Sequence, residues 1–97
     1  MKEIVLIPAY RPDDCLCELV ERLHAEGFGI LVVDDGSGEA YEAIFRRVKP
    51  YAHVLTAEKN GGKGSALKKG MAELTKRFPE MEFFITADAD GQHRVED

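Results

Sequence analysis

The sequence predicts one α/β domain, in which a parallel sheet of about four strands lies inside a three-layer α/β/α arrangement. Two observations lead to this prediction. Short apolar runs rich in β-branched residues alternate with segments of helical spacing, and this alternation is typical of right-handed βαβ units. The chain has 97 residues, 44% of them hydrophobic and 32% charged, which suits one small core in a soluble globular protein.

The first strand is expected over residues 3–8, where EIVLIP is an unbroken, largely β-branched run. The segment 13–27 has apolar side chains three or four positions apart, which predicts a helix. Asp13 or Asp14 is the expected N-cap of this helix, and Gly27 is its expected stop.

The same alternation continues along the rest of the chain. GILVVD and AHVLTA are the second and third strands, EAYEAIFRRV and KGSALKKGMAELTKRF are the second and third helices, and EFFITA is the fourth strand. Apolar residues occur on both faces of such strands, so we expect helices to cover the sheet on either side. In chain order these elements occupy residues 29–34, 39–48, 52–57, 63–78 and 82–87.

Composition and charge narrow the functional class. The net charge of −5 argues against a nucleic-acid partner or an anionic membrane surface. No run approaches the roughly 20 apolar residues of a membrane span, and the apolar N-terminal run is too short for a signal peptide. Cys15 and Cys17 match neither a CxxC redox motif nor a zinc-ligand pair, so we expect reduced thiols in a cytoplasmic protein.

Polar and glycine-rich clusters follow the carboxyl end of each predicted strand. Ligands of parallel α/β sheets bind outside these ends. The opposite rim has only helix ends such as Gly27 and Pro50. The asymmetry predicts a binding site on one rim, formed by Pro8-Ala9-Tyr10, Asp34-Asp35-Gly36-Ser37, Asn60-Gly61-Gly62-Lys63-Gly64 and Asp88-Ala89-Asp90-Gly91-Gln92-His93.

Each cluster also has a purely local interpretation. DDGS is a good turn and helix cap, and DADGQH can be a capped turn. NGGKGS lacks the Walker pattern, because position 57 is Ala and Lys63 is followed by Gly64. A receiver domain needs its acidic pair where the first strand ends, and this chain has Pro8-Ala9-Tyr10 there. A dinucleotide fold needs G-x-G-x-x-G after that strand, and this motif is absent. The position of several clusters on one rim favours a site over separate turns.

The four motifs VLIPAY, VVDDGS, NGGKGSAL and DADGQH, in this order, resemble the nucleotide-sugar-binding half of family 2 glycosyltransferases. These are inverting enzymes of the GT-A, Rossmann-like fold, and the likeness is strongest to the dolichyl- or polyprenyl-phosphate branch. The resemblance covers essentially the whole of residues 1–97. It implies the N-terminal half of that fold, with strand order 3-2-1-4.

The resemblance also implies roles for individual residues. Pro8, Ala9 and Tyr10 would wall the base and ribose pocket. Asp35 would accept a hydrogen bond from the base, with Asp34 orienting the loop, and as a turn residue on the rim Asp35 should support little of the fold. The other substrate-binding assignments are Gly62, Lys63, Asp88, Ala89 and His93.

The implied metal ligands are Asp88, Asp90 and Gln92. Asp88 and Asp90 are two positions apart, so in an extended chain their carboxylates point to the same side and repel each other. A divalent cation that prefers oxygen ligands, Mg²⁺ or Mn²⁺, would screen them and neutralise the leaving nucleoside diphosphate.

Two positions depart from the usual pattern of the family. The Tyr is usually followed by Asn, and here it is followed by Arg11, which could alter the loop or contact phosphate. A Pro usually stands two residues after the His, where this chain has Val95. Neither position belongs to the implied ligand sets.

The general base of an inverting transfer is expected beyond residue 97, so no catalytic residue is assigned within the chain. We expect the chain to be a truncated half that binds a nucleoside-diphosphate sugar. The identity of the acceptor, for example a lipid phosphate, is left open. A membrane association of the full-length protein is left open as well. A non-catalytic nucleotide-binding module and a sugar nucleotidyltransferase-like enzyme remain alternatives. EFFITA has no Lys or Pro to protect a sheet edge, so self-association through this strand is expected.

Overall fold

The computed structural model describes residues 3–57, 61–77 and 83–86, with the side chains of Lys63 and of residues 83–85 outside the description. Strands and helices alternate as the sequence predicts, and the α/β class with a parallel sheet is confirmed. The elements are β1 (Glu3–Ala9), α1 (Asp14–Ala25), β2 (Gly29–Asp34), the 3₁₀ helix η1 (Glu39–Tyr41), α2 (Glu42–Val48), β3 (His53–Thr56), α3 (Lys63–Arg77) and β4 (Phe83–Thr86).

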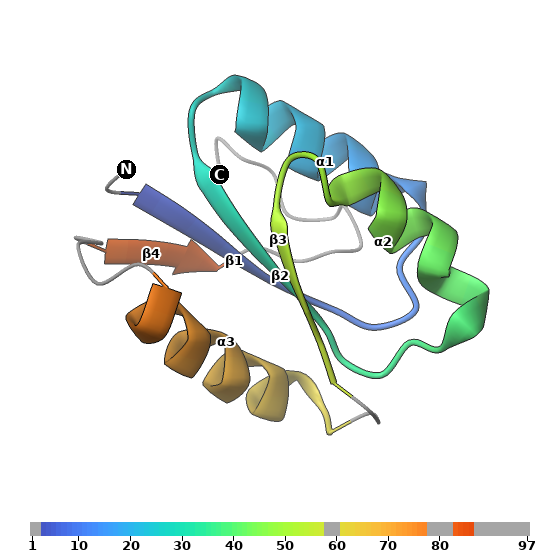
Figure 1. The fold of residues 1–97 in the computed structure, drawn as a ribbon. Helices are drawn as coiled ribbons and strands as arrows, with labels where there is room; N and C mark the ends of the chain where they lie inside the picture. Colours follow the sequence, from blue (N-terminus) through green and yellow to red (C-terminus); the bar gives the residue numbers. More distant parts are fainter. Residues whose placement is uncertain (1–2, 58–60, 78–82, 87–97) are drawn as a thin grey trace.

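The sheet is parallel with the strand order β3-β2-β1-β4, and helices cover both of its faces. Figure 1 shows α1 and α2 on one face and α3 on the other. In the register of the sheet, Ala9 lies beside Asp34, and Asp34 lies beside Thr56. The carboxyl ends of three strands therefore form one continuous rim.

Two apolar clusters hold the layers together. Alternate side chains of a strand point to opposite faces, so Val5 and Ile7 face α1 and α2 while Ile4 and Leu6 face α3. β2 divides in the same way, and the strand residues of both clusters are almost fully buried. The unbroken apolar runs of the sequence are thus the consequence of a sheet covered on both faces.

Helix α1 begins and ends close to where the sequence predicts. Asp13 is the N-cap, and its Oδ1 accepts a hydrogen bond from the Cys15 N–H at 2.9 Å. The helix ends at Ala25, and the positive φ of 91° at Gly27 turns the chain toward β2. Its buried stripe faces the sheet and consists of Leu16, Cys17, Leu19, Val20 and Leu23.

Helix α3 lies very close to the sheet at Gly70. A Cβ atom built on Gly70 would lie 2.4 Å from Leu6 Cδ1 and 3.1 Å from Val33 Cγ2. Because Leu6 and Val33 are fully buried, their side chains have little room to move away. The absence of a side chain at Gly70 therefore sets how closely α3 packs against the sheet.

Candidate functional site

The rim at the carboxyl ends of the strands contains a topological switch point. The chain passes outward from β1 through β2 to β3 and then returns to β4, on the other side of β1. The carboxyl ends of β1 and β4 therefore flank the crevice where ligands of such sheets bind. The segment after β1, which begins with Tyr10 and Arg11, belongs to the part of the chain that the structure describes.

The turn after β2 is held by short-range hydrogen bonds, as the motif DDGS predicts. The Ser37 N–H donates to Asp34 Oδ1 at 2.9 Å, and Gly36 has a positive φ of 78°. The backbone C=O of Asp34 accepts from the Ala57 N–H at 2.8 Å, just beyond β3. Asp34 is 7% exposed, so its carboxylate acts mainly on its own loop.

Asp35 joins two segments that are far apart in the sequence. Its Oδ1 accepts a hydrogen bond from the Gly61 N–H at 3.1 Å, and its Oδ2 accepts one from the Gly62 N–H at 2.9 Å. We call this arrangement the Asp35 clamp. The side chain is only 3% exposed. The expectation that Asp35 supports little of the fold did not foresee this contact, in which the carboxylate connects the turn after β2 to the approach to α3.

The two glycines of the clamp occupy positions that do not favour a side chain. A Cβ atom at Gly61 would lie 2.8 Å from Ser65 Oγ and 3.9 Å from Asp35 Oδ1. Gly62 has a positive φ of 91°, which a residue with a side chain rarely adopts. The N–H groups of Gly61 and Gly62 point to Asp35, so in this arrangement they form no open phosphate cradle.

The segment after β1 contains an unusual backbone conformation. Arg11 has a positive φ of 51°, in the left-handed region where Asn is far more common than Arg. The Arg11 N–H donates to Ser37 Oγ at 2.8 Å, which fastens this segment to the turn after β2. The Arg11 Cζ lies over the Tyr10 ring, 5.0 Å from its centroid, and Tyr10 is 45% exposed. Neither the bend nor this stacking was predicted from the sequence.

The structure brings part of the predicted substrate-binding set together. Tyr10, Asp34, Asp35 and Gly62 lie on one rim. Hydrogen bonds connect Arg11, the neighbour of Tyr10, to Ser37, Ser37 to Asp34, and Gly62 to Asp35. Pro8 is half-buried, whereas the Ala9 side chain packs in the core and its C=O accepts from the Asp35 N–H at 2.8 Å. Ala9 thus contributes to the rim through its backbone.

The remaining predicted residues cannot be placed in the same way. Lys63 is the first residue of α3, and its side chain is outside the description. Asp88, Ala89, Asp90, Gln92 and His93 lie outside the described residues. Within residues 3–57, 61–77 and 83–86, no group of three or more His, Cys, Asp or Glu side chains could hold a metal ion.

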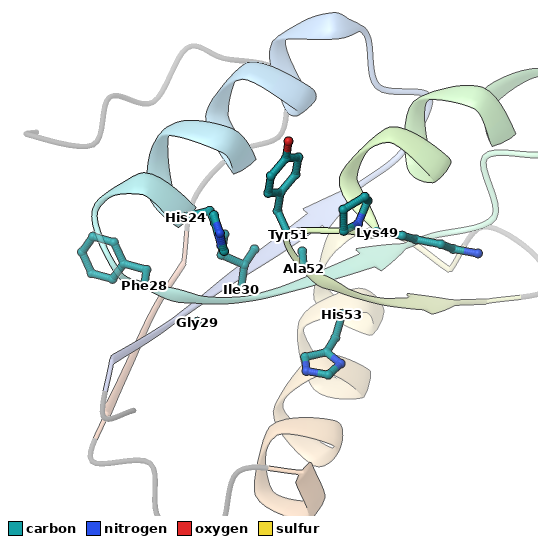
Figure 2. Close-up of a pocket in the computed structure, with 9 residues that line it drawn as sticks. His24, Phe28, Gly29, Ile30, Lys49, Tyr51, Ala52 and His53 are labelled. Carbon is teal, nitrogen blue, oxygen red and sulfur yellow. The ribbon is translucent and has the colours of Figure 1, made fainter.

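A cavity of about 480 Å³ lies at the opposite rim, where β2 and β3 begin. Figure 2 shows its lining: His24 and Tyr51 lie near each other, with ring centroids 5.1 Å apart, while Lys49 extends away and His53 lies on the other side of its strand. The basic side chains of this cavity therefore do not converge on one point, and it shares no residue with the rim that contains Asp35.

Comparisons with known proteins find a family model and several similar proteins. The model of "Glycosyl transferase family 2" matches residues 4–97. The uncharacterized protein MJ1222 of Methanocaldococcus jannaschii is 35% identical over 96 residues, which cover 96% of this chain and 37% of that protein. The uncharacterized glycosyltransferase YaiP of Escherichia coli is 30% identical over 94 residues, which cover 89% of this chain and 24% of that protein.

The chain is also similar to a solved structure. The crystal structure of S. aureus TarS 1-349 has a TM-score of 0.71 and 28% sequence identity, with 93% of this chain and 28% of that chain covered. The chain thus spans well under half the length of the relatives it matches. Among the described residues, no helix combines the length and the apolar character needed to cross a bilayer.

Proposed function

The chain belongs to glycosyl transferase family 2, and from this premise we propose that it supplies the donor site for transfer of a sugar from a nucleoside-diphosphate sugar. The donor is a UDP- or GDP-sugar, and a polyprenyl phosphate is the acceptor we favour. The observation that carries the proposal is the rim on which three separate motifs meet around the Asp35 clamp. This rim adjoins the switch point, where parallel α/β sheets bind ligands.

In this proposal the described residues recognise the nucleoside. Tyr10 offers an exposed aromatic face to the base, with Pro8 beside it. Asp35 accepts a hydrogen bond from the base, while Asp34 holds the turn in place. Gly62 and Lys63 lie at the start of α3, where the positive end of the helix dipole favours the diphosphate.

A divalent metal, Mg²⁺ or Mn²⁺, fits the chemistry of the proposed ligands Asp88, Asp90 and Gln92, because all three offer oxygen atoms. When bound, the cation would neutralise charge on the nucleoside diphosphate as it leaves. Ala89 and His93 belong to the same segment, and we assign them to the donor side of the site. The free thiols of Cys15 and Cys17 support a cytoplasmic location.

We propose that the transfer inverts the configuration of the sugar. An acceptor oxygen attacks C1, a new C–O bond forms, and the bond from C1 to the diphosphate breaks with its electron pair on the leaving group. A hydroxyl acceptor needs a base to take its proton, whereas the oxygen of a phosphate acceptor is already anionic and needs none. A polyprenyl-phosphate acceptor would therefore remove the need for that base.

Calorimetry with UDP and GDP tests the donor site. Wild-type protein should bind at least one of them more tightly with Mn²⁺ or Mg²⁺ than with EDTA, and Asp90→Ala should remove the difference. Glu26→Ala is the matched control, because it removes a carboxylate at the C-terminal end of α1, the end that lies away from the rim of the candidate site. Equal affinity with metal, with EDTA and in Asp90→Ala would contradict the metal role, and the absence of any nucleotide binding would contradict the donor site.

A further inference from the structure

Arg11 occupies the described segment that flanks the switch point, and its conformation is costly. A residue with a side chain is destabilised in the left-handed region relative to the right-handed helix, because its Cβ comes too close to the following carbonyl oxygen. Here the conformation is held by the hydrogen bond from the Arg11 N–H to Ser37 Oγ at 2.8 Å. Strained residues of this kind are concentrated at ligand sites. The strain therefore raises the question of what the side chain does.

The guanidinium of Arg11 is positioned by an aromatic ring. Its Cζ lies 5.0 Å from the centroid of Tyr10, and both side chains are exposed. Stacking uses the face of a guanidinium and leaves its N–H groups directed outward in the plane. An arginine held in this way can offer two parallel N–H donors to a phosphate.

Neighbouring acidic groups have other partners. Asp13 caps α1 by accepting from the Cys15 N–H, and Asp14 forms an ion pair with Arg47 at 3.2 Å. Within the part of the chain that the structure describes, no carboxylate forms a salt bridge with Arg11. The guanidinium therefore keeps its charge available at the rim.

We propose that Arg11 is a specificity-determining residue that binds a phosphate group of the ligand at the switch point. The inference rests on the proposed function for the identity of that ligand. The phosphate belongs either to the nucleoside diphosphate of the donor or to a lipid phosphate acceptor, and both present the same group to the guanidinium. In either case the Arg11 side chain adds affinity for the phosphate and none for the nucleoside.

The experiment measures binding of three probes to the 97-residue chain: a nucleoside, its diphosphate, and a short isoprenyl monophosphate. Arg11→Asn removes the charge with a residue that tolerates positive φ, so the fold should be retained. Arg11→Lys keeps the charge but lacks the planar guanidinium with its two parallel N–H donors. Arg46→Asn is the matched control, because it removes an arginine paired with Glu42 on the exposed side of α2.

Arg11→Asn should weaken binding of at least one phosphate probe by about tenfold or more, the range for a hydrogen bond to a charged group. Nucleoside affinity and melting temperature should not fall, Arg11→Lys should be intermediate, and Arg46→Asn should resemble wild type. Loss confined to the diphosphate identifies the donor as the source, and loss confined to the monophosphate identifies the acceptor.

Three results would overturn the inference: unchanged affinity for both phosphate probes in Arg11→Asn, an equal loss for nucleoside and diphosphate, or no phosphate binding by the wild-type chain. The proposed donor site fails on a different observation, namely that neither nucleoside nor diphosphate binds wild-type protein. The monophosphate probe still tests Arg11 in that case.

Discussion

At the scale of single residues, Asp34 and Asp35 allow the same substitution to be compared at adjacent positions. Asp35→Asn leaves one oxygen for two N–H donors, so the free energy of unfolding should fall by about 1.5–3 kcal/mol, the range for hydrogen bonds to a charged group. Asp34→Asn keeps the acceptor for the Ser37 N–H and should cost less than about 0.5 kcal/mol.

Urea denaturation of both variants checks this comparison. The slope of each transition should match that of wild-type protein, since the change concerns stability rather than the surface exposed on unfolding. Equal stability of the two variants would show that the clamp contributes nothing.

The two cysteines give a test of local charge. A hydrogen bond to Asp13 and the charge of that residue raise the pKa of the Cys15 thiol, and burial raises the pKa of Cys17. A raised pKa means less thiolate at a given pH, so alkylation of Cys15 should be slow at neutral pH and faster as the pH rises. Asp13→Asn removes the charge but keeps a good N-cap, and it should accelerate alkylation of Cys15 at mildly alkaline pH.

Mass spectrometry of the alkylated peptide follows both sites. Cys17, which is fully buried, should stay unmodified until the protein unfolds, and it serves as the internal control. An Asp13→Asn variant that reacts no faster than wild-type protein would show that the carboxylate does not govern the thiol.

Residues whose partners are close in the sequence were predictable, and those with distant partners were not. Asp34 bonds to an N–H three positions away, so the motif itself contains the interaction. Asp35 bonds to an N–H 27 positions away, across a whole strand-helix unit, and no local pattern specifies that distance. The strained φ of Arg11 was missed for the same reason, because Ser37 holds it from another loop.

At the scale of elements, Gly70 and Gly64 of α3 form a matched pair. Replacing a helical glycine with alanine stabilises a helix by roughly 1 kcal/mol when the site has room. Gly64 has open space around its Cβ position, so Gly64→Ala should be neutral or stabilising. The new methyl group of Gly70→Ala would clash with the Leu6 side chain. Overpacking of this kind costs about 1–3 kcal/mol of stability, which should exceed the gain in helix propensity.

Chemical denaturation of the two variants measures the difference. A second substitution, Leu6→Val, should recover part of the loss in the Gly70→Ala background, because it removes the atoms that the new methyl group meets. A Gly70→Ala protein as stable as Gly64→Ala would mean that α3 can shift away from the sheet at little cost.

The types of the elements could be predicted from the sequence better than their ends. The helix expected over 39–48 begins as the 3₁₀ turn η1, and the helix expected to run to Gly27 ends at Ala25. Apolar spacing reports which side chains are buried, whereas the last hydrogen bond of a helix depends on local capping. Spacing also leaves the order of strands open, and here the order was implied by the family resemblance.

At the scale of the whole molecule, the strand order has a consequence for self-association. β4 pairs with β1, and within the described sheet it lies at the edge. Its sequence, FFIT, has none of the charged residues or prolines that discourage pairing with another chain. We expect the 97-residue chain to form dimers at micromolar concentration through β4 or the surface beside it.

Light scattering of wild-type protein and of Phe84→Lys measures this association. The variant adds a charge to the edge strand β4 and should shift the protein toward monomer. Thr56→Lys adds the same charge to β3, at the other edge of the described sheet, and should leave the dimer intact. A wild-type protein that stays monomeric would contradict the prediction.

The Asp35 clamp also bears on how the molecule opens in time. Backbone amides outside regular elements usually exchange their hydrogens with solvent quickly. An amide that donates to a buried acceptor exchanges only after that hydrogen bond opens. Gly61 and Gly62 precede α3, but their N–H groups are held by a carboxylate that directly follows β2, an interior strand of the sheet. In native-state hydrogen exchange, the amides of these two glycines should therefore exchange at rates close to those of β2 and more slowly than the exposed turn at Gly38. The segment that leads into α3 would then open only when the centre of the sheet opens.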